Sequence, residues 1–138
     1  MSVLAILEIQ EGKVKKSGRE AASYAAKVAE MTGDEAIALA LGSADESELA
    51  AVGGQGVSKV VHISDDRLNK VDAKAYTKAI AGAVEALGAK VVVFSLSTTG
   101  KAVAPRLSAR LKAGLVTGVT NLPSTDNGFV VKKSVFSN

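Results

Sequence analysis

Short apolar runs alternate with stretches of helical periodicity along the chain, and this alternation is what most limits the possible fold. The apolar runs are residues 3–9, 35–41, 57–63, 91–96 and 116–122. Between them, apolar residues recur every three or four positions, the spacing of one helix face. Strands that alternate with helices form a parallel sheet through right-handed crossovers, with helices on both faces. The sequence therefore predicts a three-layer α/β/α fold with a mostly parallel sheet.

Polar residues ahead of three helical stretches predict where the helices begin. Ser17 and Glu20 have the spacing of a capping box, as do Ser43 and Glu46, and Asp72 is a suitable N-cap for a longer helix. Glycines are expected to end these helices. The first and third helices carry predicted apolar stripes, which are Ala21, Tyr24, Ala25, Val28 and Met31, and Tyr76, Ile80, Ala83, Val84 and Leu87.

The C-terminal part predicts one more strand. Residues 123–128 read Pro-Ser-Thr-Asp-Asn-Gly, and Asn-Gly is a strong hairpin signal. Residues 129–136 should then return antiparallel to the strand at 116–122. We expect residues 1–138 to form a single α/β domain. Because the chain stops directly after an apolar strand, we also expect it to be the N-terminal part of a longer chain.

Composition argues against several classes of function. Seventeen Lys and Arg against fourteen Asp and Glu give a net charge of +3, with the charges interspersed. A nucleic-acid reader usually shows a basic stripe with stacking aromatics, and neither is present. The absence of cysteine excludes disulfides, iron–sulfur clusters and thiol catalysis, and it fits a reducing cytoplasm. No window approaches the ~18 apolar residues of a membrane helix, and the N-terminus lacks the pattern of a signal peptide.

The turn after the strand at 91–96 is the best candidate site in the sequence. Its backbone amides and a lysine could hold a phosphate at the start of a helix, or the segment could be an ordinary strand-to-helix turn. A P-loop requires a glycine that is separated by four residues from the Gly-Lys pair, and a hydroxyl residue directly after the pair. Ser95 and Ala102 occupy those positions, so this is not a P-loop. The turn consists of Ser97, Thr98, Thr99, Gly100 and Lys101.

Four further residues are weaker candidates. Arg106 and Arg110 share a helix face by their spacing, and Arg106 lies nearer the sheet edge. The pair could bind a carboxylate-rich partner, but a solvated basic face with salt bridges is favoured. Glu8 follows the first strand and would lie near Ser97 if the first and fourth strands are neighbours. His62 is the only histidine, and its position in a strand favours a structural role over a metal ligand or a Ser-His-Asp triad. We predict no catalytic residue and no metal site.

Three stretches of the chain resemble the N-terminal region of the electron transfer flavoprotein alpha subunit. The first is the opening strand with its glutamate and glycine turn, residues 4–15, in which Ile9 stands where the family often has histidine. The second, residues 51–63, resembles the family's entry into its third strand. The third is the most specific and comprises Ser97 to Lys101, Pro105-Arg106-Leu107, Ala109-Arg110-Leu111 and Leu115-Val116-Thr117. Ser108 replaces an alanine of that family pattern.

The resemblance implies a fold and a role. It implies an adenine-nucleotide-hydrolase-like domain with strand order 3-2-1-4-5, acting as a scaffold without its own cofactor. FAD would be bound mainly by a separate C-terminal domain whose motifs are absent from this sequence. The partner would be the beta subunit, in a heterodimer that carries electrons from flavin dehydrogenases to an acceptor. The family works in the bacterial cytoplasm or the mitochondrial matrix.

An alternative within the same fold class is a free-standing nucleotide-binding module similar to universal stress proteins, which would use the turn at 97–101. Those proteins typically carry a Gly-rich pattern after the fourth strand, and that pattern is missing here. A hydrolytic enzyme is disfavoured because no nucleophile–base pair stands out.

Overall fold

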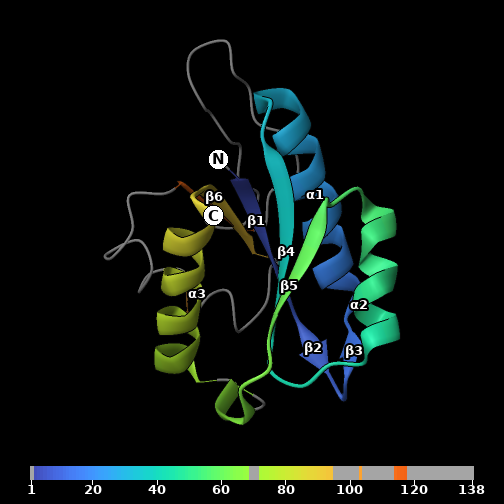
Figure 1. Cartoon of the computed structure of the whole chain (residues 1–138), viewed down its shortest axis with the longest axis vertical. Helices are drawn as coiled ribbons and strands as arrows, with labels where there is room; N and C mark the ends of the chain where they lie inside the picture. Colours follow the sequence, from blue (N-terminus) through green and yellow to red (C-terminus); the bar gives the residue numbers. More distant parts are fainter. Residues whose placement is uncertain (1, 69–71, 95–102, 104–113, 118–138) are drawn as a thin grey trace, which may run out of the picture.

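A computed structural model of the chain shows a parallel sheet between two layers of helices (Figure 1). It describes residues 2–68, 72–94, 103 and 114–117. One face of the sheet is covered by α1 (Lys16–Thr32) and α2 (Glu46–Val52), and the opposite face by α3 (Ala73–Leu87). The predicted three-layer α/β/α architecture is confirmed.

All neighbouring strands of the main sheet run parallel, in the order β5-β4-β1-β6-β7. Counted along the main sheet, this is the order 3-2-1-4-5 that the resemblance implied. β1 is the central strand, and β6 lies between it and β7. The strands are β1 (Ser2–Leu7), β4 (Glu35–Leu41), β5 (Lys59–Ile63), β6 (Ala89–Phe94) and β7 (Gly114–Thr117).

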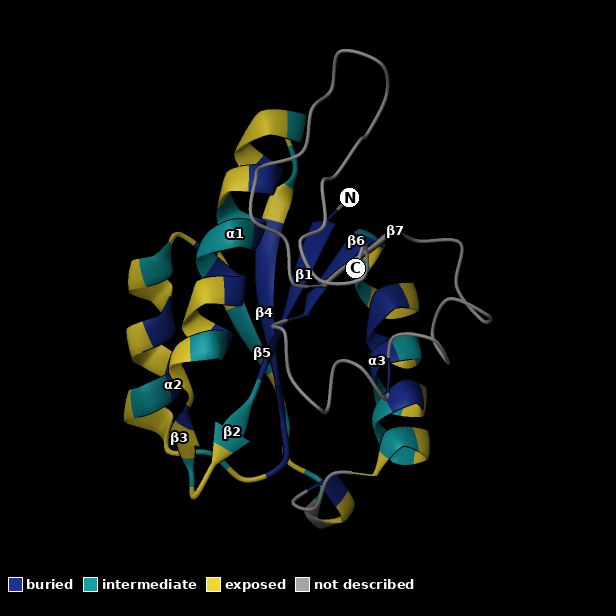
Figure 2. Cartoon of the chain, turned by 180° about the vertical axis from the view of Figure 1, so that it is seen from behind, coloured by how far each residue is buried: buried dark blue, intermediate teal, exposed yellow. Residues whose placement is uncertain are grey.

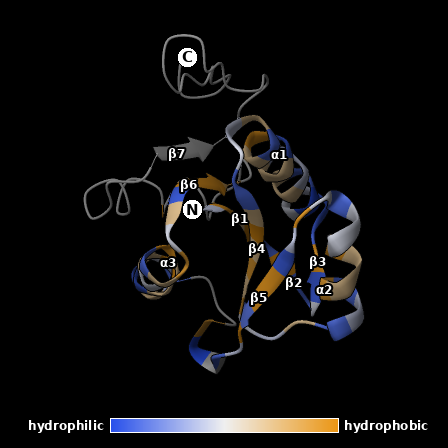
Figure 3. Ribbon diagram, turned by 45° about the horizontal axis from the view of Figure 1, so that its top comes forward, coloured by the Kyte–Doolittle hydropathy of each residue, from blue (hydrophilic) through white to orange (hydrophobic). Residues whose placement is uncertain are grey.

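The core forms on both faces of the sheet because β1 is buried along its whole length. Successive side chains of a strand point to opposite faces. Val3 and Leu7 therefore join a cluster with α1 and α2, while Leu4 and Ile6 join a cluster with α3. Figure 2 shows the central strands buried, and Figure 3 shows that they are largely hydrophobic. Burial on both faces explains why the strands read as continuous apolar runs.

The prediction of one strand over residues 3–9 is wrong. β1 ends at Leu7, and a separate hairpin follows, formed by β2 (Ile9–Gln10) and β3 (Lys13–Val14). The turn residues Glu11 and Gly12 both have positive φ, 52° and 81°, as a tight two-residue hairpin turn requires. The chain therefore reverses after β1 instead of extending it.

The other predicted strands differ from the observed strands mainly at their ends. The strand at 35–41 is confirmed, whereas β5 begins two residues later than predicted. β6 and β7 each begin two residues earlier than predicted. The predicted helix after residue 101, the 123–128 turn and the strand at 129–136 lie wholly or almost wholly outside the described residues.

Two of the three predicted helix starts are wrong. α1 has Lys15 as its N-cap, with no side-chain capping bond, so Ser17 lies inside the first turn. The backbone N–H of Lys15 donates to the carbonyl of Glu8 at 2.9 Å, which fixes where the helix begins. α2 likewise begins after Asp45 rather than Ser43, because the N–H of Asp45 donates to the Gly12 carbonyl at 2.8 Å. In both cases the β2–β3 hairpin sets the start of the helix.

The third predicted start is confirmed. Oδ1 of Asp72 accepts hydrogen bonds from the backbone N–H groups of Lys74, at 2.9 Å, and Ala75, at 3.3 Å. The predicted stripe of α1 fails at Met31, which is 43% exposed because it lies in the last turn of the helix. Among the described residues, no helix has the length and hydrophobicity needed to cross a membrane.

Candidate functional site

The carboxyl edge of the sheet carries the residues that could form a site. All strands of the main sheet are parallel, so their C-terminal ends meet at one edge, where open α/β sheets usually bind ligands. Glu8 follows β1, Ser43 follows β4 after one glycine, and Asp65 follows β5 closely. The 3-10 helix η2 (Asp66–Leu68) and the first turns of α3 close this edge on one side.

Of the site residues predicted from the sequence, the structure describes Glu8 and His62. β1 and β6 are neighbours, so Glu8 and the segment that follows β6 leave the sheet at the same edge. The expected proximity of Glu8 to Ser97 itself falls outside the described part of the chain. The same is true of Ser97, Thr98, Thr99, Gly100, Lys101, Arg106 and Arg110.

Glu8 is a largely buried carboxylate at the junction of β1 and the hairpin. Its side chain is 13% exposed, and Oε2 lies 3.6 Å from Nζ of Lys15. Its backbone is held as tightly, because the Lys15 N–H donates to its carbonyl and α1 approaches its amide at Gly18. Glu8 is therefore a fixed negative charge at the carboxyl edge.

Tyr76 is the aromatic residue of this edge. Its hydroxyl donates to the carbonyl of Leu68 at 3.1 Å, which ties α3 to η2. Burial, followed by the negative charge of Glu8, raises the pKa of the Tyr76 phenol above its ordinary value. Tyr76 and Glu8 are thus coupled electrostatically although they come from different elements.

These elements enclose a pocket of about 240 Å³. Its walls come from the β2–β3 hairpin, the end of β4, η2 and α3. Its lining is mixed, with apolar side chains beside the polar groups of Glu11, Ser43 and Tyr76. The lining residues are Ile9, Glu11, Gly12, Leu41, Ser43, Leu68 and Tyr76.

Sequence reasoning missed Tyr76 and Leu68 as site residues. Tyr76 fits the apolar stripe of α3, and nothing in the sequence indicates that η2 folds back to accept its hydrogen bond. A polar-tipped aromatic in the first turn of a helix that starts at the carboxyl edge is the one signal that could have indicated this role. Ser43 was interpreted as a helix cap, and it lines the pocket instead.

The described side chains show no catalytic arrangement. His62 is exposed on β5, and its Nε2 contacts the carbonyl of Gly42. This contact fits the structural role predicted for the histidine. Within the described ranges, no group of three or more His, Cys, Asp or Glu could hold a metal ion. The pocket at the carboxyl edge can accept a small polar group, and Glu11 is the charged residue among its described lining residues.

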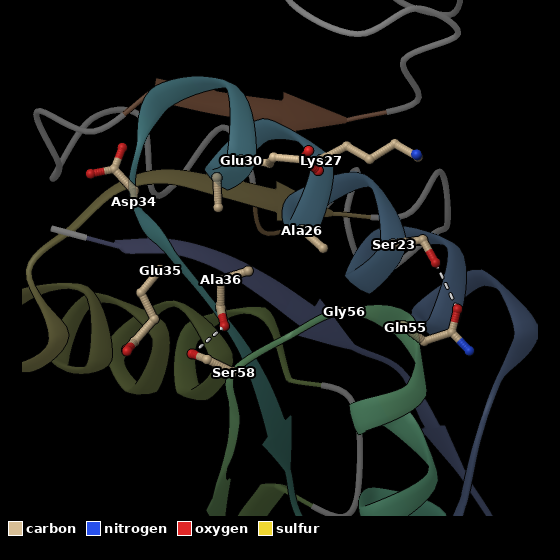
Figure 4. A pocket seen from close by; sticks show the side chains of 11 residues that line it. Ser23, Ala26, Lys27, Glu30, Asp34, Glu35, Ala36, Gln55, Gly56 and Ser58 are labelled. Atoms are coloured by element: carbon tan, nitrogen blue, oxygen red, sulfur yellow. Dashed lines mark hydrogen bonds between the residues drawn. The ribbon is translucent and has the colours of Figure 1, made fainter.

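A larger pocket of about 430 Å³ lies at the opposite, amino edge, between α1 and the loop that leads into β5 (Figure 4). Its polar groups are mostly paired within the protein. The Ser23 hydroxyl donates to Gln55 Oε1 at 2.6 Å, and Ser58 donates to the Ala36 carbonyl at 3.0 Å. The Lys90 ammonium and the Thr32 hydroxyl hold the pKa of Asp34 below its ordinary value. These contacts hold the amino edge together.

We expect Glu8→Gln to lower the pKa of Tyr76, because it removes the negative charge that opposes phenolate formation. The pKa should stay above 10.0, since burial is the larger cause of the shift. A group with a raised folded-state pKa stabilises the fold below its unfolded pKa, so this contribution is lost as the pH rises above about 10. Phenolate absorbance against pH, in a Tyr24→Phe background that leaves one tyrosine, measures the shift. Identical titration curves with and without Glu8 would contradict the coupling.

Comparisons with known proteins connect the whole chain to one family. The family model described as "Electron transfer flavoprotein domain" matches residues 3–138. The electron transfer flavoprotein subunit alpha of Bacillus subtilis (strain 168) is 26% identical over 136 residues, which are 98% of this chain and 41% of that protein. The acryloyl-CoA reductase electron transfer subunit beta of Anaerotignum propionicum is 28% identical over 123 residues, 89% of this chain and 34% of that protein. The chain thus spans well under half of these relatives.

Solved structures show the same fold at low sequence identity. The universal stress protein of Archaeoglobus fulgidus has a TM-score of 0.56 and 13% identity, with 85% of this chain and 97% of that chain covered. A universal stress protein in complex with cAMP has a TM-score of 0.53 and 11% identity, with 88% and 97% covered. At these identities the likeness concerns the fold alone.

Proposed function

This chain belongs to the electron transfer flavoprotein domain family, and from that premise we propose that it is the N-terminal domain of an alpha subunit. Its role is that of a scaffold in a two-subunit, FAD-dependent electron carrier, not of an enzyme. The observation that carries the proposal is the family match over residues 3–138. In this proposal residues 1–138 are one domain of a longer chain that works in the bacterial cytoplasm, or in the mitochondrial matrix of a eukaryote.

The alpha assignment has two supports. The Bacillus subtilis relative, whose alignment spans nearly the whole chain, is an alpha subunit. The segment from Ser97 to Leu111 also carries the alpha-like motif of the sequence. The second relative is called a beta subunit of another electron transfer complex. The broader role, an electron transfer subunit, therefore has more support than the choice between alpha and beta.

The described residues do not fit FAD. A dinucleotide needs backbone amides or cations for its pyrophosphate, whereas the charged residue that lines the described pocket is Glu11. The pocket there, about 240 Å³, is also smaller than the roughly 300–1,000 Å³ of typical ligand sites. We therefore propose that FAD is held outside these residues, mainly by a further domain of the same chain.

What this domain contributes is a rigid body and its surface. The sheet is buried on both faces, and the hairpin, α1 and the end of β1 are tied together at Glu8. Such a body can hold a flavin-bearing domain and the beta subunit in a fixed relation. In this proposal the segment from Ser97 to Arg110 stabilises the domain or contacts the partner.

The test is co-expression of the whole gene product with the second electron transfer flavoprotein subunit of the same organism. We expect a stable one-to-one complex with the visible spectrum of oxidised flavin, reduced by a flavin dehydrogenase and its substrate. Residues 1–138 expressed alone should carry no flavin. A whole gene product that forms no complex and binds no flavin would refute the proposal.

A second candidate is a nucleotide-binding module, which the universal stress protein fold and the carboxyl-edge pocket favour. The carboxylate of Glu11 in the lining of that pocket opposes binding of a phosphate. Calorimetry with ATP or AMP separates the two functions, because micromolar binding by the isolated chain would favour the nucleotide-binding module.

A further inference from the structure

A groove between α3, η2 and the end of β5 is separate from the carboxyl-edge pocket and has a volume of about 270 Å³. Leu68 divides the two hollows, because it lines both of them. We call this hollow the α3 groove. It is lined by Ile63, Asp65, Arg67, Leu68, Ala75, Lys78 and Ala79.

The floor of the α3 groove is formed by apolar side chains of β5, the edge strand of the sheet, together with those of η2 and α3. Leu68 is buried, whereas Ile63, Ala75 and Ala79 are only half-buried. Figure 2 shows the contrast between the half-buried β5 and the fully buried strands at the centre. Among the described residues, apolar side chains of the groove floor are therefore only partly covered.

The rim of the α3 groove carries positive charge. Nη2 of Arg67 lies 2.7 Å from Oδ2 of Asp65, so these two charges offset each other. Lys78 and Lys74 lie one helical turn apart on α3, and both are exposed. Within the described residues, neither lysine ammonium takes part in a salt bridge. Lys78 thus lines the groove as a cation outside the Asp65–Arg67 pair, and Lys74 adds a second positive charge one helical turn before it.

We propose that the α3 groove is a docking site for the second subunit of the complex. An apolar side chain of that subunit fills the floor, and carboxylates of the same segment pair with Lys74 and Lys78. The inference rests on the proposed function, because it requires a two-subunit complex. The inference goes beyond the proposed function by naming the surface of this domain that binds the second subunit. It also names the chemistry of the bound segment, which is acidic and amphipathic.

The volume and charge of the α3 groove favour the second subunit as its occupant over a small molecule or a second copy of this chain. The groove is slightly smaller than the roughly 300 Å³ at which small-molecule sites begin, but it is large enough for one anchoring side chain. A second copy of this chain, with a net charge of +3, would bring positive charge to a positive rim. An apolar pocket with a polar rim is the usual structure of an interface hot spot.

The experiment measures binding of the whole gene product to the second subunit. Ala79→Arg fills the floor and should weaken binding by at least about thirtyfold, the effect of losing a hot spot. Ala86→Arg, on an exposed part of the same helix, is its matched control and should change binding little. Lys78→Glu should weaken binding about tenfold at low salt, with the loss shrinking as salt is added. Lys27→Glu makes the same charge change on α1 and is its control.

The outcomes separate this inference from the proposed function. If the unaltered proteins form no complex, both fail. If the unaltered complex forms and carries flavin, and Ala79→Arg and Lys78→Glu bind as well as their controls, the docking site is wrong and the proposed function stands. A change in self-association of the chain instead of partner binding would also overturn the docking site. Urea midpoints of all four variants show whether each one is folded.

Discussion

Replacing Leu4 by alanine is expected to lower the free energy of unfolding by about 2–5 kcal/mol. Leu4 lies in the central strand, is fully buried, and has Ile37 and Val92 as its register partners in the two neighbouring strands. Removing its side chain leaves a cavity between the sheet and α3, which the flanking strands cannot collapse to fill. A domain of this size has only about 5–15 kcal/mol of stability, so this one change removes a large part of it.

The control for Leu4 is Met31→Ala. Met31 is the exposed large hydrophobic residue of the described part of the chain, so its truncation should cost no more than about 0.5 kcal/mol. Urea unfolding gives both values. A lower midpoint with an unchanged slope of the unfolding free energy against urea concentration would show a loss of stability alone. A cost below about 1 kcal/mol for Leu4→Ala would mean that the core on the α3 face is loosely packed.

The layers of the fold could be predicted from the sequence because both faces of the sheet are buried. Burial on both faces produces the apolar runs at 35–41 and 91–96, and these identify strands without any knowledge of partners. The strand order followed from the family resemblance, since the pattern alone allows several parallel arrangements. Asp72 was predicted correctly because its side chain caps α3 within the local sequence.

The starts of α1 and α2 could not be predicted because contacts distant in sequence decide them. Ser17 and Ser43 have good capping spacing, but the hydrogen bonds of Lys15 to Glu8 and of Asp45 to Gly12 place the helices. The end of β1 could not be predicted either, because β2 of the hairpin begins at Ile9 and its apolar side chain extends the run of β1.

Prediction of the candidate site was limited by tertiary contacts even more than prediction of the helix starts. Glu8 could be proposed as a candidate because it lies near the end of the first apolar run, at the edge where such sheets bind ligands. Tyr76 was not found, because its role depends on η2 returning to accept its hydrogen bond. In the described part of this edge, η2 and α3 are tied together at Tyr76, and Glu8 lies close enough to act on the Tyr76 phenol.

The second large effect is expected at Gly18, where α1 meets the end of β1. A Cβ at this position would lie 3.0 Å from the backbone nitrogen of Glu8 and 3.4 Å from the Cα of Leu7. Both atoms belong to the backbone, so they cannot move aside as a flexible side chain can. Gly18→Ala should therefore cost about 1–3 kcal/mol, and the branched side chain in Gly18→Val should cost more.

Gly82→Ala is the matched control, because Gly82 also lies inside a helix but faces open space. There the gain in helix propensity acts alone and should stabilise the protein by up to about 1 kcal/mol. The two Gly→Ala changes should thus shift the urea midpoint in opposite directions. Gly18→Ala should also disturb Glu8, so the Tyr76 titration should change in this variant and not in Gly82→Ala. If both variants are more stable, α1 does not pack as closely on the carboxyl edge as the 3.0 Å approach requires.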